Sequence, residues 1–346
     1  MYSFFRCAPF CGVLFMLLAI SALPAAAITI DTVFVGNPGN APDPYNTQRG
    51  SVPYSYRMGT TEVTNDQYAA FLNAKAQVDV LHLYNSEMAG SLWSGIVRSG
   101  SNGNWVYSSK PNMGNKPVNF VNWYDAIRFA NWLGNGQGDS DTETGSYTLG
   151  EVDANGIPNS DTTITRNFGA TWVIPTEDEW YKAAYHQPEA DGGPLNDYWR
   201  YAATSNEAPT QATANSVGDI ANPGPNVVNW NSGADWNGVD GNFTTVGSAG
   251  PESRSYYGTY DQDGNVMEWN EDLRVDELRQ YRGSFHLSNS PGAIGSTSAG
   301  VAQPAAHYTS MGFRVAVVPE PSALVLAGIG AVGLLAGGLR KRRTIH

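Results

Sequence analysis

The chain has 346 residues, of which 41% are hydrophobic and 15% are charged, so it is long enough for one large domain or two small ones. Its 32 acidic and 20 basic residues give a formal net charge of −12. Without Arg6, Glu320 and the four cations of Arg340–Arg343, which belong to the two terminal segments, the body carries about −16. This acidity argues against nucleic acid or an anionic lipid surface as a partner.

The N-terminal residues have the pattern of a secretory signal peptide. Arg6 precedes an apolar run from Val13 to Ile20, and the three alanines Ala25–Ala27 offer a small-residue cleavage site. We therefore expect residues 1–27 to direct export and to be removed afterwards.

Both cysteines of the chain, Cys7 and Cys11, fall in this signal segment. Cys11 precedes the apolar run instead of following it, which excludes the arrangement of a lipoprotein signal. The exported body contains no cysteine, so it cannot form a disulfide, bind a metal through thiolate or use a cysteine nucleophile. The lack of cysteine therefore excludes several kinds of function at once.

Three segments of the body predict helices. The first begins after Thr64, which forms a capping box with Gln67, and the third begins after Thr176, which pairs in the same way with Glu179. The second runs from Trp123 to Leu133 and is ended by the glycines that follow it.

Short segments rich in β-branched and aromatic residues predict strands, separated by long loops of Gly, Pro, Asn and Ser. The longest irregular stretches are residues 85–115 and 186–260, and we find no internal repeat. The predicted strands are Thr32–Val35, Tyr54–Met58, a strand beginning at Trp172, Phe243–Val246 and the terminal Gly312–Val317.

The body contains all 10 tryptophans of the chain. Burial of a large ring stabilises a core strongly, so tryptophans in or beside regular elements are expected inside. These are Trp123, Trp132, Trp180 and Trp269. The tryptophans in polar loops are candidates for exposed rings, namely Trp93, Trp105, Trp199 and Trp236.

The stretch from Asp261 to Trp269 combines two spaced aspartates, a Gly264-Asn265 turn and a Glu-Trp pair. Carboxylates at alternate positions can surround a hard cation such as calcium, and glycine accepts a positive φ in the turn. A solvated loop between strands is the open alternative. The acids between Asp139 and Asp161 are spaced more loosely, and there we expect a solvated loop.

Several short motifs occur in one particular order, and in that order they resemble the formylglycine-generating enzyme, or sulfatase-modifying factor, family. The resemblance covers nearly the whole body and implies one domain over residues 28–317. It implies an α+β, C-type-lectin-like fold, low in regular structure, with mixed short sheets and about three helices. The motifs are Met58-Gly59, Glu62–Asn65, Pro117-Val118, Val121–Ala126, Ile174–Trp180, Gly264–Trp269, Arg282–Ser284 and Gly312–Arg314.

The resemblance also implies two structural calcium ions. Acidic residues would bind through their side chains, and glycine and valine through backbone carbonyls. The first site would consist of Asp261, Gly264, Val266 and Glu268, and the second of Asn215, Ser216 and Asp240.

The catalytic groups of the family are missing from the sequence. Its oxidases use two cysteines after the motif that matches Arg282–Ser284, but residues 285–292 of this chain contain none. A second branch of the family uses a cluster of histidines to hold non-haem iron, and no two histidines here are three or four residues apart. A metal role for His286 or His307 stays open.

The C-terminal segment resembles the PEP-CTERM sorting signal of Gram-negative bacteria, which an exosortase reads and cuts. Val318–Ser322 carries the Pro-Glu-Pro signature, Ala323–Leu339 is an apolar run of minimal membrane-spanning length, and Arg340–Arg343 is a basic cluster. We expect residues 318–343 to form a sorting and transient membrane-anchor segment, and the body to reach the cell surface or the extracellular space.

These features favour a secreted, surface-sorted, non-catalytic binding or matrix protein, stabilised by calcium. Loops 85–115 and 186–245 would present a surface, including the loop tryptophans, to an extracellular glycan or protein. The alternatives are an enzyme of the same family that uses a metal site without cysteine, and a structural component of the extracellular matrix without a specific ligand.

Overall fold

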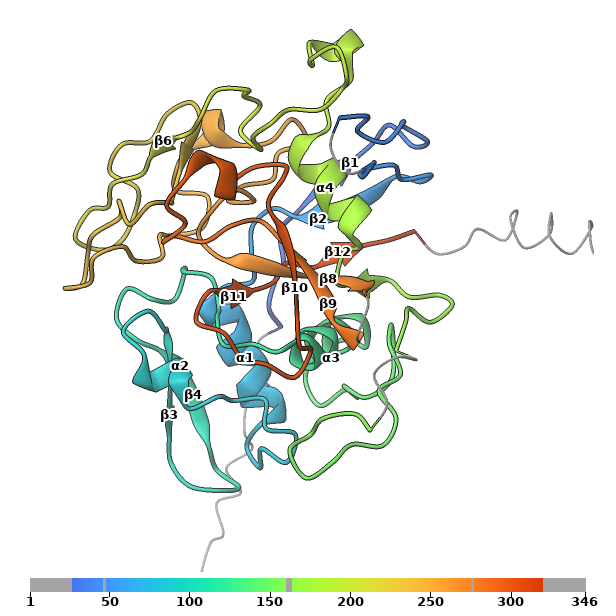
Figure 1. Cartoon of the computed structure of the whole chain (residues 1–346). Coiled ribbons are helices and arrows are strands. Elements are labelled where there is room, and N and C mark those ends of the chain that lie inside the picture. The colour runs from blue at the N-terminus through green and yellow to red at the C-terminus, as the bar shows by residue number, and fades with distance from the viewer. Residues whose placement is uncertain (1–26, 46–47, 160–163, 275–276, 320–346) are drawn as a thin grey trace, which may run out of the picture.

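The computed structural model describes residues 27–45, 48–159, 164–274 and 277–319 (Figure 1). The helices are α1 (Asn65–Lys75), α2 (Glu87–Gly90), α3 (Trp123–Gly134) and α4 (Glu177–Tyr185), with short 3₁₀ turns η1 (Glu189–Asp191), η2 (Pro251–Ser253) and η4 (Pro291–Ala293). The strands are β1 (Thr32–Val35), β2 (Tyr56–Gly59), β3 (Ile96–Ser99), β4 (Val106–Ser109), β5 (Trp172–Val173), β6 (Thr210–Gln211), β7 (Val227–Val228), β8 (Met267–Leu273), β9 (Arg279–Arg282), β10 (Ala299–Ala302), β11 (Met311–Gly312) and β12 (Ala316–Val317).

Two four-stranded sheets form the centre of the described chain. The first has the order β1-β2-β12-β5 and is antiparallel throughout. The second has the order β10-β9-β8-β11, in which only β11 runs parallel to its neighbour β8. Figure 1 shows α4 above the central strands, and α1 and α3 below them. Strands from the beginning and the end of the body therefore share one sheet.

The helix starts agree with the sequence prediction. The Thr64 side chain accepts a hydrogen bond from the Gln67 backbone, and the Gln67 side chain accepts one from the Thr64 N–H. Thr176 and Glu179 make the same reciprocal pair at the start of α4. Each pair satisfies N–H groups that the first helical turn leaves without partners. Both predicted capping boxes are confirmed.

An aromatic cluster joins α1 to α3 and to the segment between β11 and β12. The rings of Phe71 and Phe129 are 5.4 Å apart at their centroids, and Phe313 lies 5.4 Å from Phe129. Edge-to-face packing of this kind adds to the gain from burying apolar area. The four tryptophans expected in the core are buried, which confirms that prediction for Trp123, Trp132, Trp180 and Trp269.

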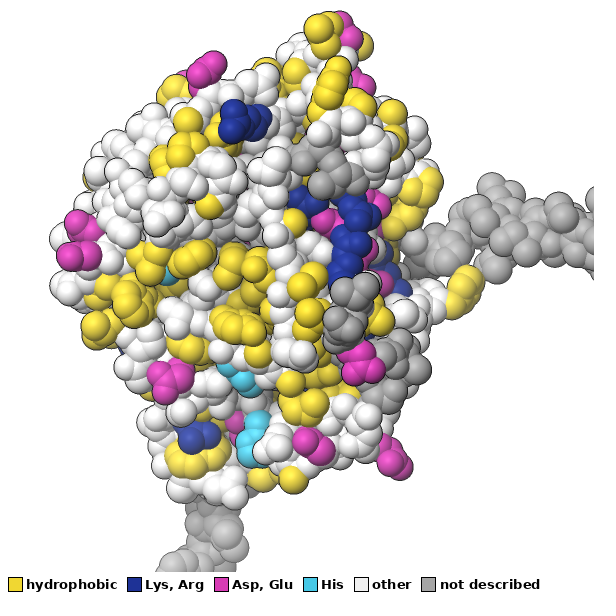
Figure 2. All heavy atoms as spheres, viewed as in Figure 1, with side chains coloured by type: hydrophobic (Ala, Val, Ile, Leu, Met, Phe, Trp, Pro, Cys, Tyr) yellow, Lys and Arg dark blue, Asp and Glu magenta, His cyan; other side chains and the backbone are white. Residues whose placement is uncertain are grey.

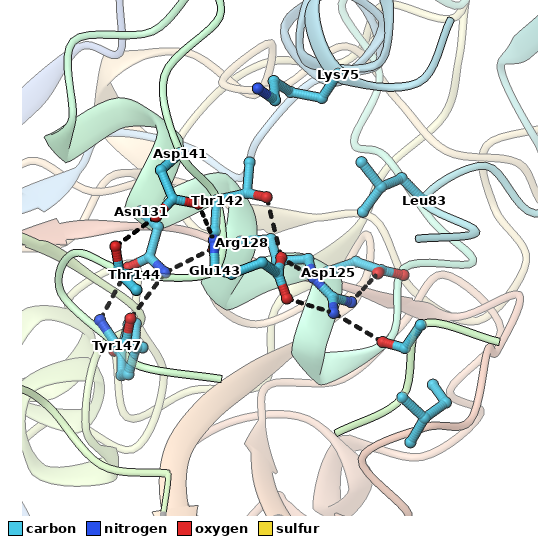
Figure 3. A network of polar contacts seen from close by, with 12 residues as sticks. Lys75, Leu83, Asp125, Arg128, Asn131, Asp141, Thr142, Glu143, Thr144 and Tyr147 are labelled. Atoms are coloured by element: carbon cyan, nitrogen blue, oxygen red, sulfur yellow. Dashed lines mark hydrogen bonds and ion pairs between the residues drawn. The ribbon is translucent and has the colours of Figure 1, made fainter. Parts of the chain in front are cut away.

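The acidic loop after α3 is bound to that helix more closely than the sequence predicts (Figure 3). Arg128 is fully buried and donates to both carboxylate oxygens of Glu143, at 2.7 and 3.0 Å. Asn131 donates to the carbonyl oxygen of Thr142 at 2.8 Å. The expectation of a simple solvated loop over residues 139–161 is wrong at Glu143, because a buried guanidinium requires a charged partner.

Two strand predictions need correction. Residues 243–246 form no strand, because side chains satisfy their backbone: the Asn265 side chain accepts from the Thr244 N–H, and Trp236 donates to the Phe243 carbonyl. The terminal segment is split into β11 and β12, since β11 pairs with β8 in one sheet and β12 pairs with β2 and β5 in the other.

The long loops also contain regular structure that the sequence analysis did not predict. Residues 85–115 include the single turn α2 and the antiparallel hairpin β3-β4. None of the described helices is long and apolar enough to cross a membrane. The expected signal peptide, apart from Ala27, and the apolar run Ala323–Leu339 lie outside the described residues.

Candidate functional site

The loop before β8 folds back into the protein interior. Asp261 and Asn265 both take left-handed backbone conformations, with φ of 61° and 60°. Gly264 does not, and it is required for another reason, since a Cβ there would collide with the carbonyl oxygen of Asn229. The expected positive φ is therefore supplied by Asn265, while Gly264 permits a close approach of two backbones.

Glu268 is a fully buried carboxylate at the start of β8. Its Oε2 accepts from Arg314 Nε at 2.6 Å and from Trp180 Nε1 at 2.7 Å, and its Oε1 accepts from Arg314 Nη2 at 2.7 Å. Arg314 also donates to the carbonyl oxygen of Gly59 at 3.0 Å. The predicted ligand Glu268 thus takes part in a bidentate ion pair, and the one donor at Oε1 leaves that oxygen able to accept another bond.

Glu62 is a member of this cluster that the ligand assignment missed. It is 1% exposed, and among the described residues neither of its carboxylate oxygens has a hydrogen-bond partner. Burial raises the pKa of Glu62 well above its usual value, and the nearby negative charge of Asp261 raises it further. The sequence did contain a signal, because Glu62 opens a motif whose next residues enter the core and the cap of α1.

The charges of the cluster do not balance. Three carboxyl groups, those of Glu62, Asp261 and Glu268, interact with the single guanidinium of Arg314. Burial raises the pKa of Asp261 to about 6, and its carboxylate accepts from the Gly247 N–H at 2.6 Å. Uncompensated charge is costly away from water, so a proton or a cation is required here.

A small cavity lies beside the same loop. Its volume is about 10 Å³, which is room for one water molecule or ion, and Asp261, Asp263 and Gly264 are among its lining residues. Asp263 is already engaged, accepting from the Tyr185 hydroxyl at 2.7 Å and from the Ala202 N–H at 2.6 Å. Glu62, whose oxygens are the unpartnered ones, is not among these lining residues, so Asp261 is the carboxylate that the cavity leaves for an ion.

Side chains alone do not complete such a centre. Within the described part of the chain, no three or more His, Cys, Asp or Glu side chains are grouped so that they could hold a metal ion. A cation at Asp261 would therefore need backbone oxygens as well, which is the role predicted for Gly264 and Val266.

The second predicted site has a different geometry. Asn215, Ser216 and Asp240 are all exposed. Oδ1 of Asn215 accepts from the backbone N–H groups of Val217 and Asp219, each at 3.0 Å, so it closes a local turn. Among the described residues, no hydrogen bond joins Asp240 to Asn215 or Ser216. These residues fit a calcium site poorly.

The ammonium group of Lys116 holds this second loop. Lys116 Nζ donates to the carbonyl oxygen of Val217 at 2.8 Å and to Thr245 Oγ1 at 2.6 Å, and it lies 4.9 Å from the centre of the Trp236 ring. Thr245 in turn donates to Asp219 at 2.6 Å. Trp236 is buried under this contact, so the expectation of an exposed ring is wrong for it.

The arginine of the Arg282–Ser284 motif has a structural role. Arg282 is buried and donates to Glu177 Oε1 through Nε at 2.8 Å and Nη2 at 2.5 Å. Arg49 and Arg274 pair with the other oxygen of Glu177. Figure 2 shows Lys and Arg side chains gathered in one strip on this face, with acidic side chains beside them.

The first residues after this motif, 285–288, are buried or half-buried, while residues 289–292 are exposed. His286 is completely buried, its ring lies 4.3 Å from that of Phe243, and its Nδ1 lies 3.3 Å from the Asn265 carbonyl oxygen. Burial lowers the pKa of His286 to about 4, so the ring is neutral near pH 7. His307 is half-buried, with Nε2 3.6 Å from Asp125 Oδ2, and it lies apart from this segment in the chain.

Two solved structures and one curated protein resemble parts or all of the body. CarF is 22% identical, with a TM-score of 0.50, and the match covers 85% of this chain and 100% of CarF. PvdO from Pseudomonas aeruginosa is 17% identical, with a TM-score of 0.42, and the match covers 86% of this chain and 100% of PvdO. The likeness to CarF supports the α+β fold alone.

The chaperone protein LppX of Paenibacillus barcinonensis is 27% identical over 160 residues, which are 44% of this chain and 51% of LppX. The chain thus matches only about half the length of that curated relative.

Two family models match the sequence. The PEP-CTERM protein-sorting motif covers residues 317–343, and it marks a chain for export, for C-terminal membrane anchoring during sorting and for recognition by exosortase machinery. The sulfatase-modifying factor enzyme 1-like domain covers residues 33–318, which includes every motif of the body from Met58 to Arg314. The chain belongs to the sulfatase-modifying factor enzyme 1-like family.

Proposed function

We propose that this protein is an exported, surface-sorted and non-catalytic member of its family, whose fold serves to bind an extracellular glycan or protein. The observation that carries the proposal is the absence of cysteine from the body, together with the burial of His286 directly after the Arg282–Ser284 motif. The family's oxidase chemistry needs thiolates there, and soft thiolates are also the ligands that copper(I) requires. His286, which lies in that segment, is buried against Phe243.

Calcium has a structural part in this proposal. Asp261 and Gly264 line a cavity with room for one ion, and the buried Glu62 carboxyl is close enough to Asp261 to be affected by its charge. A bound divalent cation would neutralise the excess of buried carboxylates and tie the start of α1 to the loop before β8. The second loop is already held by Lys116, so we propose one calcium ion instead of two.

The test of this function uses the exported chain after removal of the signal peptide. We expect calcium at about one ion per chain in a metal analysis, and no oxidation of a peptide cysteine in the presence of copper(I) and oxygen. Turnover of that peptide would overturn the non-catalytic proposal. A redox metal at near-unit stoichiometry would instead favour the alternative, an enzyme with a metal site that contains no cysteine.

Sorting to the surface is tested separately. Replacing Pro319, Glu320 and Pro321 with alanine should leave export intact and keep the protein in the inner membrane, because the signature read by the exosortase is gone. Cell fractionation of the triple variant against the unchanged chain measures this. Equal amounts of both proteins at the cell surface would contradict surface sorting through this motif.

A further inference from the structure

A groove of about 710 Å³ lies between the edge strand β1, the turn η1 and the tight turn of residues 255–259. This volume is within the range of small-molecule sites. None of its lining residues belongs to the calcium cluster. The groove is lined by Phe34, Gly36, Asn37, Pro188, Ala190, Asp191, Tyr256 and Tyr257.

Aromatic rings form the walls of this groove. Phe34 is 60% exposed and Tyr256 is 40% exposed, while Tyr257 is half-buried beside them. Large exposed rings grouped on one concave surface are typical of an interaction site. Single exposed rings scattered over a surface are common and indicate no site.

The aromatic rings are held in place by fixed segments. The turn that carries the two tyrosines is closed by a hydrogen bond from the Ser255 N–H to the Thr259 carbonyl at 2.8 Å, and the hydroxyls of the same residues lie 2.7 Å apart. The Tyr257 hydroxyl lies 2.8 Å from His186 Nδ1, and its ring is nearly parallel to that of His186. A site fixed before binding loses little conformational entropy when a ligand arrives.

Polar groups border the rings. The Tyr256 hydroxyl donates to Asp191 Oδ2 at 2.9 Å, which fixes the carboxylate at the rim of the groove. Asn37 is exposed in a left-handed conformation with φ of 55°, and its carbonyl oxygen accepts from Lys182 Nζ at 2.8 Å. The groove therefore offers a carboxylate acceptor and an amide beside two aromatic faces.

This combination selects the chemistry of the ligand. A sugar ring has an apolar C–H face that can pack on Phe34 and Tyr256, and hydroxyls at its edge that can bond to Asp191 and Asn37. Among the described residues that line the groove, Asp191 alone is charged, and the exported body carries about −16, so an acidic polymer would be repelled. We propose that the groove binds a neutral saccharide, which rests on the proposed function of the chain as a binding protein.

Isothermal titration of the exported chain, in calcium, tests this proposal with cellohexaose and mannohexaose as neutral probes and hexagalacturonate as the acidic one. We expect a neutral probe to bind and Phe34→Ala to weaken binding about tenfold, since it removes a stacking surface. Tyr256→Phe keeps the ring and loses the bond to Asp191, and we expect a loss of about threefold. Phe168→Ala is the matched control, because Phe168 is 76% exposed outside the groove.

All three positions are exposed or nearly so, and thermal melting of each variant shows whether the fold is kept. Failure of both neutral probes to bind, preference for hexagalacturonate, or equal effects of Phe34→Ala and Phe168→Ala would each overturn the saccharide groove. Binding of a peptide strand or of a second copy along β1 in place of the sugars would overturn it too. If a peptide strand or a second copy binds, the proposed non-catalytic binding function still stands. Oxidation of a peptide cysteine would overturn the non-catalytic proposal, whatever the groove binds.

Discussion

The two loops expected to hold calcium balance their charges in different ways. The loop of residues 261–268 is drawn into the interior, where Glu62, Asp261 and Glu268 outnumber Arg314. The predicted ligands of the second site, Asn215, Ser216 and Asp240, lie at the surface, and the ammonium group of Lys116 already bonds to the oxygens of Val217 and Thr245 nearby. The neighbours that the fold supplies therefore decide whether the charges of each loop are balanced by the protein itself.

Burial decides how strongly each loop depends on its partners. When a buried charge loses its partner, no water can take the partner's place. An exposed carboxylate that loses its partner is solvated by water instead. Substitutions around Arg314 should therefore have large effects on stability, and those at Asp240 small ones.

Arg314→Leu should have the largest effect. It leaves Glu268 as an uncompensated buried carboxylate beside Asp261, and we expect the free energy of unfolding to fall by about 3–5 kcal/mol. Urea denaturation in a calcium chelator measures this. The matched control is Arg57→Leu, because Arg57 lies exposed on β2 and should contribute less than about 1 kcal/mol. Similar losses for both variants would mean that the buried pair does not hold the cluster together.

Calcium itself should have the next largest effect. At a concentration one hundred times its Kd, a ligand specific for the folded state adds about 2.7 kcal/mol to stability. Glu62→Gln should remove most of this gain, because a neutral amide cannot offset the charge of the cation, and should not destabilise the calcium-free protein. Unfolding with and without chelator measures both effects. If Glu62→Gln stabilises the calcium-free protein but keeps the full calcium gain, Glu62 is a protonated carboxyl and not a ligand.

The buried His186 lies outside both loops and tests how burial makes stability depend on pH. Burial lowers its pKa to about 4, and the charges acting on it are those of Lys182 and Asp197. Its Nε2 has no hydrogen-bond partner within the part of the chain that the structure describes. Between pH 6.5 and pH 4 the unfolded chain binds the proton and the folded one does not, so stability is full above 6.5 and falls as the pH drops. We expect His186 to account for about 2–3 kcal/mol of that loss.

The comparison with His186→Gln isolates this contribution from the carboxylates that titrate in the same range. Unfolding free energies of both proteins at pH 7 and pH 4.5 give the difference between their pH dependences. An identical pH dependence in the two proteins would show that His186 is not held neutral in the fold.

Local sequence patterns predicted local structure well. Thr64 with Gln67, and Thr176 with Glu179, identify two helix starts because each box involves only residues three positions apart. Trp236 shows where such reasoning fails. Its polar loop suggested an exposed ring, but Lys116, from a distant part of the chain, packs on that ring at 4.9 Å. No local pattern contains that contact.

The candidate sites show the same limit. The motif at Asp261 and Glu268 could be assigned from its residues, but Glu62 joins it only through the fold. The saccharide groove could not be predicted, because Phe34, Asp191 and Tyr256 stand in three separate segments. Each of these residues is unremarkable in its own segment, and only their shared surface gives them a function.

Asp240→Asn should have the smallest effect and gives the sharpest test of the difference between the loops. Asp240 is exposed, so we expect the free energy of unfolding to change by less than about 0.5 kcal/mol and the calcium gain to stay unchanged. Calcium titration of this variant and of Glu62→Gln, followed by unfolding, compares the two loops directly. A reduced calcium gain in Asp240→Asn would mean that calcium binds the surface loop despite Lys116. In that case the excess of carboxylates at the buried loop would be balanced by protons instead.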